Sequence, residues 1–145
     1  MARQIKLDDR EKIEIVDADG NVTGYFRFNP TDTAIIERFE NIEKYFKDKQ
    51  KYLASIQNGN DIDIINELIR EIKIEFDKFL NYEGAGETLF KNCSPLAIRP
   101  NGEMHAVYVV NALINFIQSE LKSRSKKAEA NISKYTNKYQ KRYHK

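Results

Sequence analysis

Residues 17–21 read DADGN and have the residue types and spacing that begin a calcium-binding loop. An EF-hand loop also needs a glycine at its sixth position and a bidentate carboxylate at its twelfth. Counted from Asp17, those positions hold Val22 and Phe28, and the flanking residues alternate between apolar and polar as strands do. The segment therefore predicts a hairpin turn, and the sequence predicts no metal site here.

Cys93 and His105 have the side chains of a nucleophile and a general base. Such a pair also needs a thiolate and a third group that orients the imidazole, and the spacing follows no catalytic signature. A small apolar side chain beside a proline turn is the favoured interpretation of Cys93. Because Cys93 is the only cysteine, an intramolecular disulfide and a thiolate zinc cluster are both excluded. The second histidine, His144, lies near the C-terminus, which argues against a histidine-based metal site.

Residues 84–88 read GAGET and could open a helix around a phosphate. A phosphate loop is longer, ends in Lys-Ser/Thr and follows a buried strand. Here a predicted helix comes first and Glu87 would repel a phosphate, so the segment predicts a junction between helices. The other carboxylates are spread along solvent faces without forming a pair. The sequence therefore predicts no catalytic residue, no metal ligand and no cofactor, and we expect that the protein is not an enzyme.

The C-terminal residues 122–145 combine positive charge with a stripe of tyrosines. They hold nine Lys/Arg and the single acid Glu129, whereas the rest of the chain holds 15 basic and 21 acidic residues. The tyrosines are spaced i, i+4, i+8 and would share one face of a helix. The candidate partner-binding residues of this tail are Lys134, Tyr135, Lys138, Tyr139, Lys141, Arg142 and Tyr143.

Three interpretations of this tail remain open. The cations could contact nucleic-acid phosphates while the tyrosines stack on bases. The tail could instead dock on an acidic, partly apolar protein surface and fold as it binds. It could also serve only as a solubilising terminus. The lack of a second basic patch argues against a nucleic-acid partner and favours a protein partner.

Residues 11–28 predict a β-hairpin, because alternating residues flank the turn at residues 17–21. An isolated two-stranded hairpin is marginal in water, so this one must pack on helices or pair with another chain. We expect Phe26 and Phe28 to supply the contact face. Together with Tyr25 they form a second set of candidate partner-binding residues.

Helical periodicity covers most of the remaining chain. A first helix is expected after Pro30, with Thr31 or Asp32 as its cap and Gly59 as its end, and a second from about 61 to Leu80. A short helix is expected at 86–91, and a closing helix is expected to begin near 101–103. The fold class is therefore mainly α: a hairpin and helical domain over residues 1–121 and a basic tail, helical or disordered, over residues 122–145. The predicted core comprises Ile35, Phe39, Ile42, Phe46, Ile65, Leu68, Ile69, Ile72, Phe76, Val110, Ile114 and Ile117.

The N-terminal residues contain no apolar stretch typical of a secretory signal, and no apolar run approaches the roughly 20 residues that a spanning helix needs. A lone thiol suits a reducing compartment. We therefore expect a soluble cytoplasmic protein without a membrane partner. The apolar stripes exceed what three helices need, which leaves room for a homo-oligomer.

Several phrases of the sequence occur in a familiar order. GYFRF at 24–28 is followed by NPTD at 29–32 and IIERFENI at 35–42. FDKFL at 76–80 and GAGETLF at 84–90 come next, and the Lys/Tyr-rich tail contains KYQKRY at 138–143. Over roughly residues 11–145 the chain resembles the small tail assembly chaperones and related tail proteins of long-tailed phages and prophages of Gram-positive bacteria.

The resemblance implies a non-enzymatic role in the cytoplasm of the host cell. Proteins of this family are thought to hold the aggregation-prone tape measure protein and to recruit tail tube subunits to it. We therefore expect phage tail proteins, the tape measure and the tail tube, as partners. Two alternatives are a structural virion component, such as a connector or tail completion protein, and a nucleic-acid-binding regulator.

Overall fold

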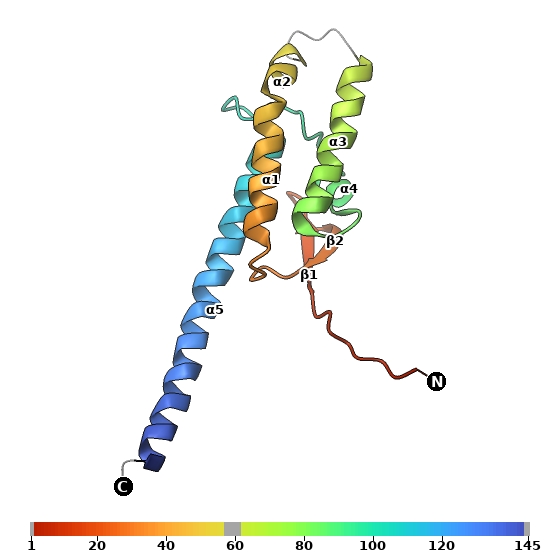
Figure 1. Cartoon of the computed structure of the whole chain (residues 1–145). Coiled ribbons are helices and arrows are strands. Elements are labelled where there is room, and N and C mark those ends of the chain that lie inside the picture. Colours follow the sequence, from red (N-terminus) through yellow and green to blue (C-terminus); the bar gives the residue numbers. More distant parts are fainter. Residues whose placement is uncertain (1, 57–61, 144–145) are drawn as a thin grey trace.

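The computed structural model describes residues 2–56 and 62–143, with the side chains of residues 2–53 and 62–131. Two antiparallel strands at the N-terminus are followed by five helices in the described ranges (Figure 1). The chain is mainly helical with an N-terminal hairpin, which confirms the predicted fold class. The predicted helix end at Gly59 lies outside the described residues.

The hairpin consists of β1 (Glu11–Val16) and β2 (Val22–Phe28), paired so that Ile13 lies opposite Phe26. Residues 17–21 form the turn, as predicted. The Asp17 carboxylate accepts hydrogen bonds from the backbone N–H groups of Asp19 and Asn21, each at 2.9 Å. This carboxylate therefore stabilises the turn, a common role of aspartate in tight turns.

The first predicted helix is divided into α1 (Ile35–Asp48) and α2 (Gln50–Ile56). Lys49 separates them with a φ of −95° and a ψ of 3°, which lies outside the helical range. Its ammonium lies 3.6 Å from the Glu71 carboxylate on the neighbouring helix. The predicted cap at Thr31 or Asp32 is wrong, because the N-cap residue is Ala34 and no side chain caps the helix. The Asp32 carboxylate instead accepts a hydrogen bond from the Ala34 N–H at 3.0 Å in the turn before the helix.

Helices α3 (Ile62–Leu80) and α4 (Ala85–Leu89) meet at a tight junction. Asn81 and Gly84 both have positive φ angles, which turn the chain sharply. The carboxylate of Asp77 then accepts hydrogen bonds from the N–H groups of Gly84 at 3.2 Å and Gly86 at 2.7 Å. These two bonds fix the start of α4 against the end of α3.

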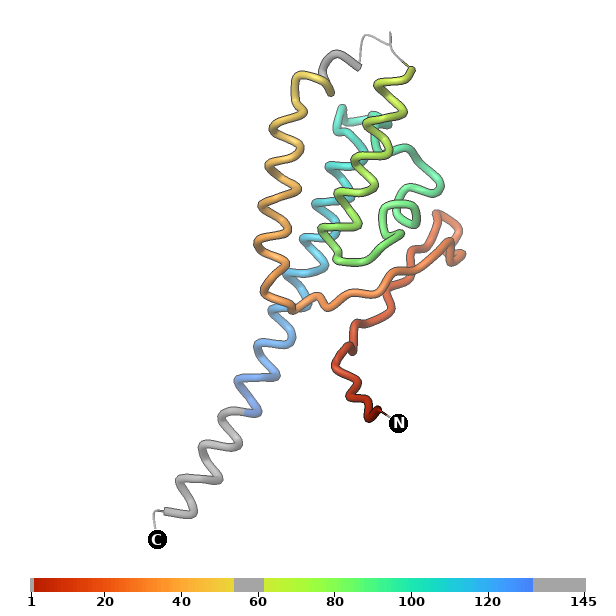
Figure 2. Tube along the Cα trace, turned by 45° about the vertical axis from the view of Figure 1, so that its right-hand side comes forward, coloured from red at the N-terminus to blue at the C-terminus, as the bar shows by residue number. Residues whose placement is uncertain are grey.

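Helix α5 (His105–Tyr143) runs beside α1 and continues beyond the other elements (Figures 1 and 2). Leu121 is partly buried against the core, whereas residues 122–131 are exposed apart from the half-buried Arg124. The helix crosses residue 121 without a break. The predicted division of the chain at 121 therefore coincides with a change in burial inside one helix.

One hydrophobic core joins the hairpin to all helices except α2 among the described side chains. Seven of the twelve predicted core residues are buried and the other five are partly buried. Phe26 and Phe28 reach the centre of this core with 0% and 1% exposure, so the hairpin packs on the helices. Besides these two rings, the buried hydrophobic residues that the sequence analysis left out of the core are Phe79, Leu80, Ala85, Phe90, Ala106 and Leu113.

Candidate functional site

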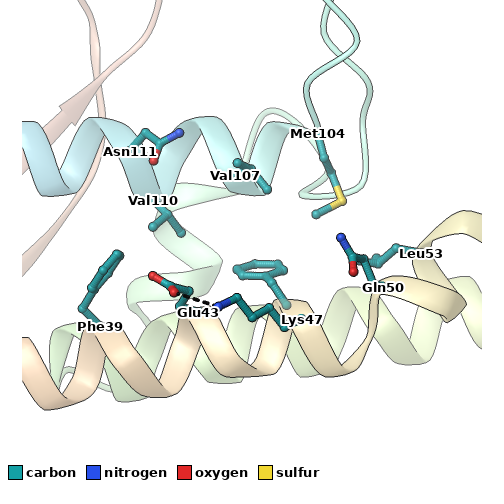
Figure 3. Close-up of a pocket in the computed structure, with 10 residues that line it drawn as sticks. Phe39, Glu43, Lys47, Gln50, Leu53, Met104, Val107, Val110 and Asn111 are labelled. Atoms are coloured by element: carbon teal, nitrogen blue, oxygen red, sulfur yellow. Dashed lines mark ion pairs between the residues drawn. The ribbon is translucent and has the colours of Figure 1, made fainter.

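An apolar groove of about 280 Å³ lies between α1–α2 and the start of α5 (Figure 3). Side chains from both walls point into it, and the Met104 side chain projects from the loop at its end. The lining residues are Phe39, Glu43, Phe46, Lys47, Gln50, Leu53, Met104, Val107, Val110 and Asn111.

The first wall of the groove comes from a seven-residue repeat along α1 and α2. Phe39, Phe46 and Leu53 recur at this interval and remain partly exposed. Ile35 and Ile42 follow the same interval on the adjoining edge of α1, yet both are buried in the core. One edge of the apolar stripe thus packs inside the domain, and the other edge faces the groove.

The second wall is the first part of α5, whose position is fixed by the preceding loop. The N–H of His105 donates to the Ala97 carbonyl at 2.7 Å, and the N–H of Ala106 donates to the Pro95 carbonyl at 2.9 Å. Ala106 is fully buried. These contacts tie the first residues of α5 to the preceding loop. Val107 and Val110 then face α1 across the groove (Figure 3).

The rim of the groove is polar and charged. Glu43 and Lys47 form an ion pair at 3.3 Å, and both side chains are exposed. Gln50 and Asn111 are also exposed and bring amide groups to the rim from opposite walls. An apolar floor with a polar rim is the arrangement found at protein–protein contacts.

A second cavity of about 560 Å³ lies between the hairpin, the α4 region and α5. Cys93 and His105 both line it, so the structure brings the two residues to one cavity. Among the hydrogen bonds of the described residues none joins them, and the thiol of Cys93 donates to the Ser94 carbonyl at 3.7 Å. Burial, together with the positive charge of Arg99, lowers the pKa of His105, which favours its neutral form.

His105 is held by aromatic packing. Its ring stands edge-on to Phe90 with centroids 5.8 Å apart, and it stacks on Tyr108 with centroids 6.2 Å apart. The Arg99 guanidinium lies 3.6 Å from the centroid of the Tyr108 ring. These contacts account for the position of His105 as part of the packing between α4 and α5.

The hairpin residues that the sequence singled out lie in two different environments. Phe26 packs on Phe28 with ring centroids 5.8 Å apart, and Phe28 packs on Phe116 of α5 at 6.3 Å. Tyr25 points the other way and is 44% exposed, with the Lys12 ammonium 4.6 Å from its ring centroid. Only Tyr25 of the three is therefore available to a partner in this fold.

The predicted tail set lies on α5, whose described backbone extends to Tyr143. The side chains of Lys134, Tyr135, Lys138, Tyr139, Lys141, Arg142 and Tyr143 lie outside the described residues.

The sequence analysis missed the groove wall on α5. It predicted a closing helix that begins near residues 101–103 but singled out neither Val107 nor Met104, which both line the groove. The available signal was the seven-residue spacing of Phe39, Phe46 and Leu53, which places an apolar row along one side of the predicted helix.

In the part of the chain whose side chains are described, no three histidine, cysteine or acidic residues converge as ligands of one metal ion. No helix in the described ranges combines the length and apolar character needed to cross a bilayer. Comparison of the chain with family models, with curated proteins and with solved structures found no match.

Proposed function

We propose that this protein is a non-enzymatic phage tail assembly chaperone that binds the tape measure protein, the tail tube protein or both during tail morphogenesis in the host cytoplasm. The observation that carries the proposal is the open apolar groove between α1–α2 and α5. The resemblance of the sequence to small tail assembly chaperones supplies the class of partner.

The geometry of the groove fits an amphipathic helix. Its walls are themselves helices, and Phe39, Phe46 and Leu53 repeat at the interval used by helix–helix seams. At about 1.5 Å per residue, the stretch from Phe39 to Leu53 extends about 21 Å, or some four helical turns. A partner helix with apolar residues at i, i+3, i+4 and i+7 would bury them between the walls.

The charged rim suits a helix whose outer face is polar. Glu43 and Lys47 offer one negative and one positive charge at the groove edge, and Gln50 offers hydrogen bonds. Groups at a rim of this kind select partner and register more than they add affinity. A long helical protein such as a tape measure would present many successive segments of the required pattern.

The proposal is tested by co-expressing the full chain with the tape measure and tail tube proteins of the same phage and measuring affinity for the captured partner. Leu53→Lys places a charge on the groove wall and is expected to weaken binding about tenfold or more, equivalent to roughly 1.4 kcal/mol. Ile36→Lys is the matched control, because Ile36 is on α1 but 61% exposed and outside the groove lining. Equal loss of binding in both variants would exclude the groove as the binding site.

Mass spectrometry of purified particles separates the chaperone from the structural alternative. A chaperone is expected in cell extracts with tape measure or tube protein and absent from mature particles. A fixed copy number in the particle would instead identify a virion component such as a connector or tail completion protein. Binding to DNA that falls steeply with salt would favour the nucleic-acid-binding regulator.

A further inference from the structure

An extended N-terminal arm, residues 2–10, precedes β1 and leaves the domain (Figure 1). Ile5 and Leu7 on this arm are 83% and 85% exposed, more than any other large hydrophobic side chain of the described residues. They alternate with Gln4, Lys6 and Asp8, which is the pattern of a strand with one apolar face.

The domain itself offers a place for such a strand. In the described ranges the sheet consists of β1 and β2 alone, so the outer edge of β1 has no strand beside it. Six consecutive residues, 13–18, line the second cavity. Four of these residues, 13–16, belong to β1. Because successive strand side chains point to opposite faces, a lining that includes consecutive β1 residues indicates that the cavity extends to the edge of the strand. The opposite wall is apolar and includes Leu113 and Phe116 of α5.

The arm of the same chain is directed away from this edge. It continues β1 backwards from Glu11, whereas the cavity begins at Ile13 and extends toward the hairpin turn. Arg10 anchors the junction by donating to the Asn81 carbonyl at 2.9 Å and by pairing with Asp8 at 2.7 Å. Residues 2–10 contain no glycine or proline that would favour a reversal. The edge is therefore better suited to the arm of another molecule.

We propose that the arm of a second copy of this chain adds to the outer edge of β1 as an antiparallel strand, in a reciprocal exchange between two protomers. In the register that sets Leu7 opposite Ile13, Ile5 lies opposite Ile15 and both apolar side chains enter the second cavity. The same register sets Lys6 opposite the partner's Glu14. It also brings Asp8 opposite the partner's Lys12, so that both polar pairs have opposite charges.

The charges also discriminate between registers. A shift of two residues one way keeps the apolar face inward but sets Lys6 opposite Lys12. A shift of two residues the other way sets Asp8 opposite Glu14. Like charges directly opposite each other destabilise a sheet, whereas opposite charges stabilise it. The proposed register also sets Asp9 opposite the partner's Glu11 and Arg10 opposite the partner's Arg10. Of these three registers it still brings the largest number of opposite charges together while it keeps Ile5 and Leu7 opposite Ile15 and Ile13.

The exchange closes the assembly at two chains. Each protomer contributes one arm and one edge, and the contact of Lys6 with Glu14 is repeated with the roles reversed, as a twofold axis requires. The added strand also satisfies backbone N–H and C=O groups that an open edge leaves unpaired.

Sedimentation of the full chain over a range of concentrations tests the proposal. The wild-type chain is expected to dimerise, and Ile5→Ser/Leu7→Ser is expected to raise the dissociation constant about a hundredfold or more, because two apolar side chains per arm lose their burial. Ile36→Ser/Ile62→Ser is the control, since it removes two exposed isoleucines that lie on helices. Lys6→Glu and Glu14→Lys are each expected to weaken the dimer about tenfold, and the double variant to restore it.

A zero-length carbodiimide crosslink between Lys6 and Glu14, formed in a mixture of ¹⁵N-labelled and unlabelled protein, identifies the donor of the arm. A link between labelled and unlabelled copies is expected. A wild-type chain that remains monomeric, a dimer unaffected by the arm substitutions, or a link found only within one copy would each overturn the proposal.

Discussion

Replacing Gly86 with alanine tests the closest approach between α4 and α3. The new Cβ would press against the carbonyl oxygen of Lys73, with the carbonyl carbon and Cα of that residue both 2.6 Å away. These are backbone atoms of a long helix, so α4 must move away from α3. That movement also lengthens the 2.7 Å hydrogen bond from the Gly86 N–H to Asp77.

The expected cost follows from these two effects. Overpacking of a tight contact costs about 1–3 kcal/mol. Weakening a hydrogen bond to a charged carboxylate adds about 1 kcal/mol or more. We therefore expect Gly86→Ala to lower the free energy of unfolding by about 3 kcal/mol. For a chain of this size the Tm would fall by about 6–12 °C.

Urea and thermal unfolding followed by circular dichroism measure this change. Gly24→Ala is the control, because its Cβ would meet the Thr88 methyl group at 2.8 Å. A side-chain methyl can shift more easily than a helix backbone, so this variant should lose less than about 1 kcal/mol. Equal stability of Gly86→Ala and the wild type, or equal losses in the two variants, would refute the reasoning about the α3–α4 contact.

Three further predictions concern individual side chains. Burial and the nearby Arg99 lower the pKa of His105 in the folded chain, so the unfolded chain binds a proton more readily. The Tm of the wild type should therefore fall as the pH is lowered from 7.5 to 5.5, and it should fall by less in His105→Gln. Tyr45→Phe removes the 2.9 Å hydrogen bond from the phenol to Glu71 and should cost about 1–2 kcal/mol in urea unfolding. Phe76→Ala, at a fully buried ring that stands edge-on to its neighbour Phe90, should cost about 3–5 kcal/mol in the same assay.

The local elements were predictable because short-range rules determine them. Residues 17–21 form the hairpin turn because Asp17 reaches the N–H groups of residues two and four positions ahead. The apolar period of α3 is equally local in origin, since Leu68, Ile72 and Phe76 share one face of a helix and are all buried. Such patterns need no knowledge of the rest of the chain.

The break at Lys49 was not predictable in the same way. Periodicity alone favoured one helix through this region. Lys49 takes the position at which the seven-residue interval from Ile35 to Ile42 would place the next apolar residue. In the fold, Lys49 faces Glu71 of α3, and its ammonium forms an ion pair with the Glu71 carboxylate at 3.6 Å. A contact between two residues so far apart in the chain has no signature in the local sequence.

The candidate site likewise combines features that the local sequence predicts with features that depend on tertiary contacts. The sequence specified the apolar repeat that supplies Phe39, Phe46 and Leu53, but not which edge of the stripe would remain open. It also marked Phe26 and Phe28 as a contact face without indicating whether the contact would be internal or external. Both rings are buried in the domain's own core, and Tyr25 alone of the three is left at the surface.

By itself the sequence determined the mainly helical class, the hairpin with its turn, and the alternation of apolar and charged residues on each element, because backbone propensity and periodicity act over a few residues. Only the tertiary structure decided that α5 stands apart from α1 along the groove, and that residues of β1 line a cavity together with residues of α5. Those features depend on which faces of elements distant in the sequence pack against each other in the core. Burial at one face leaves another face uncovered, and local sequence does not reveal which one.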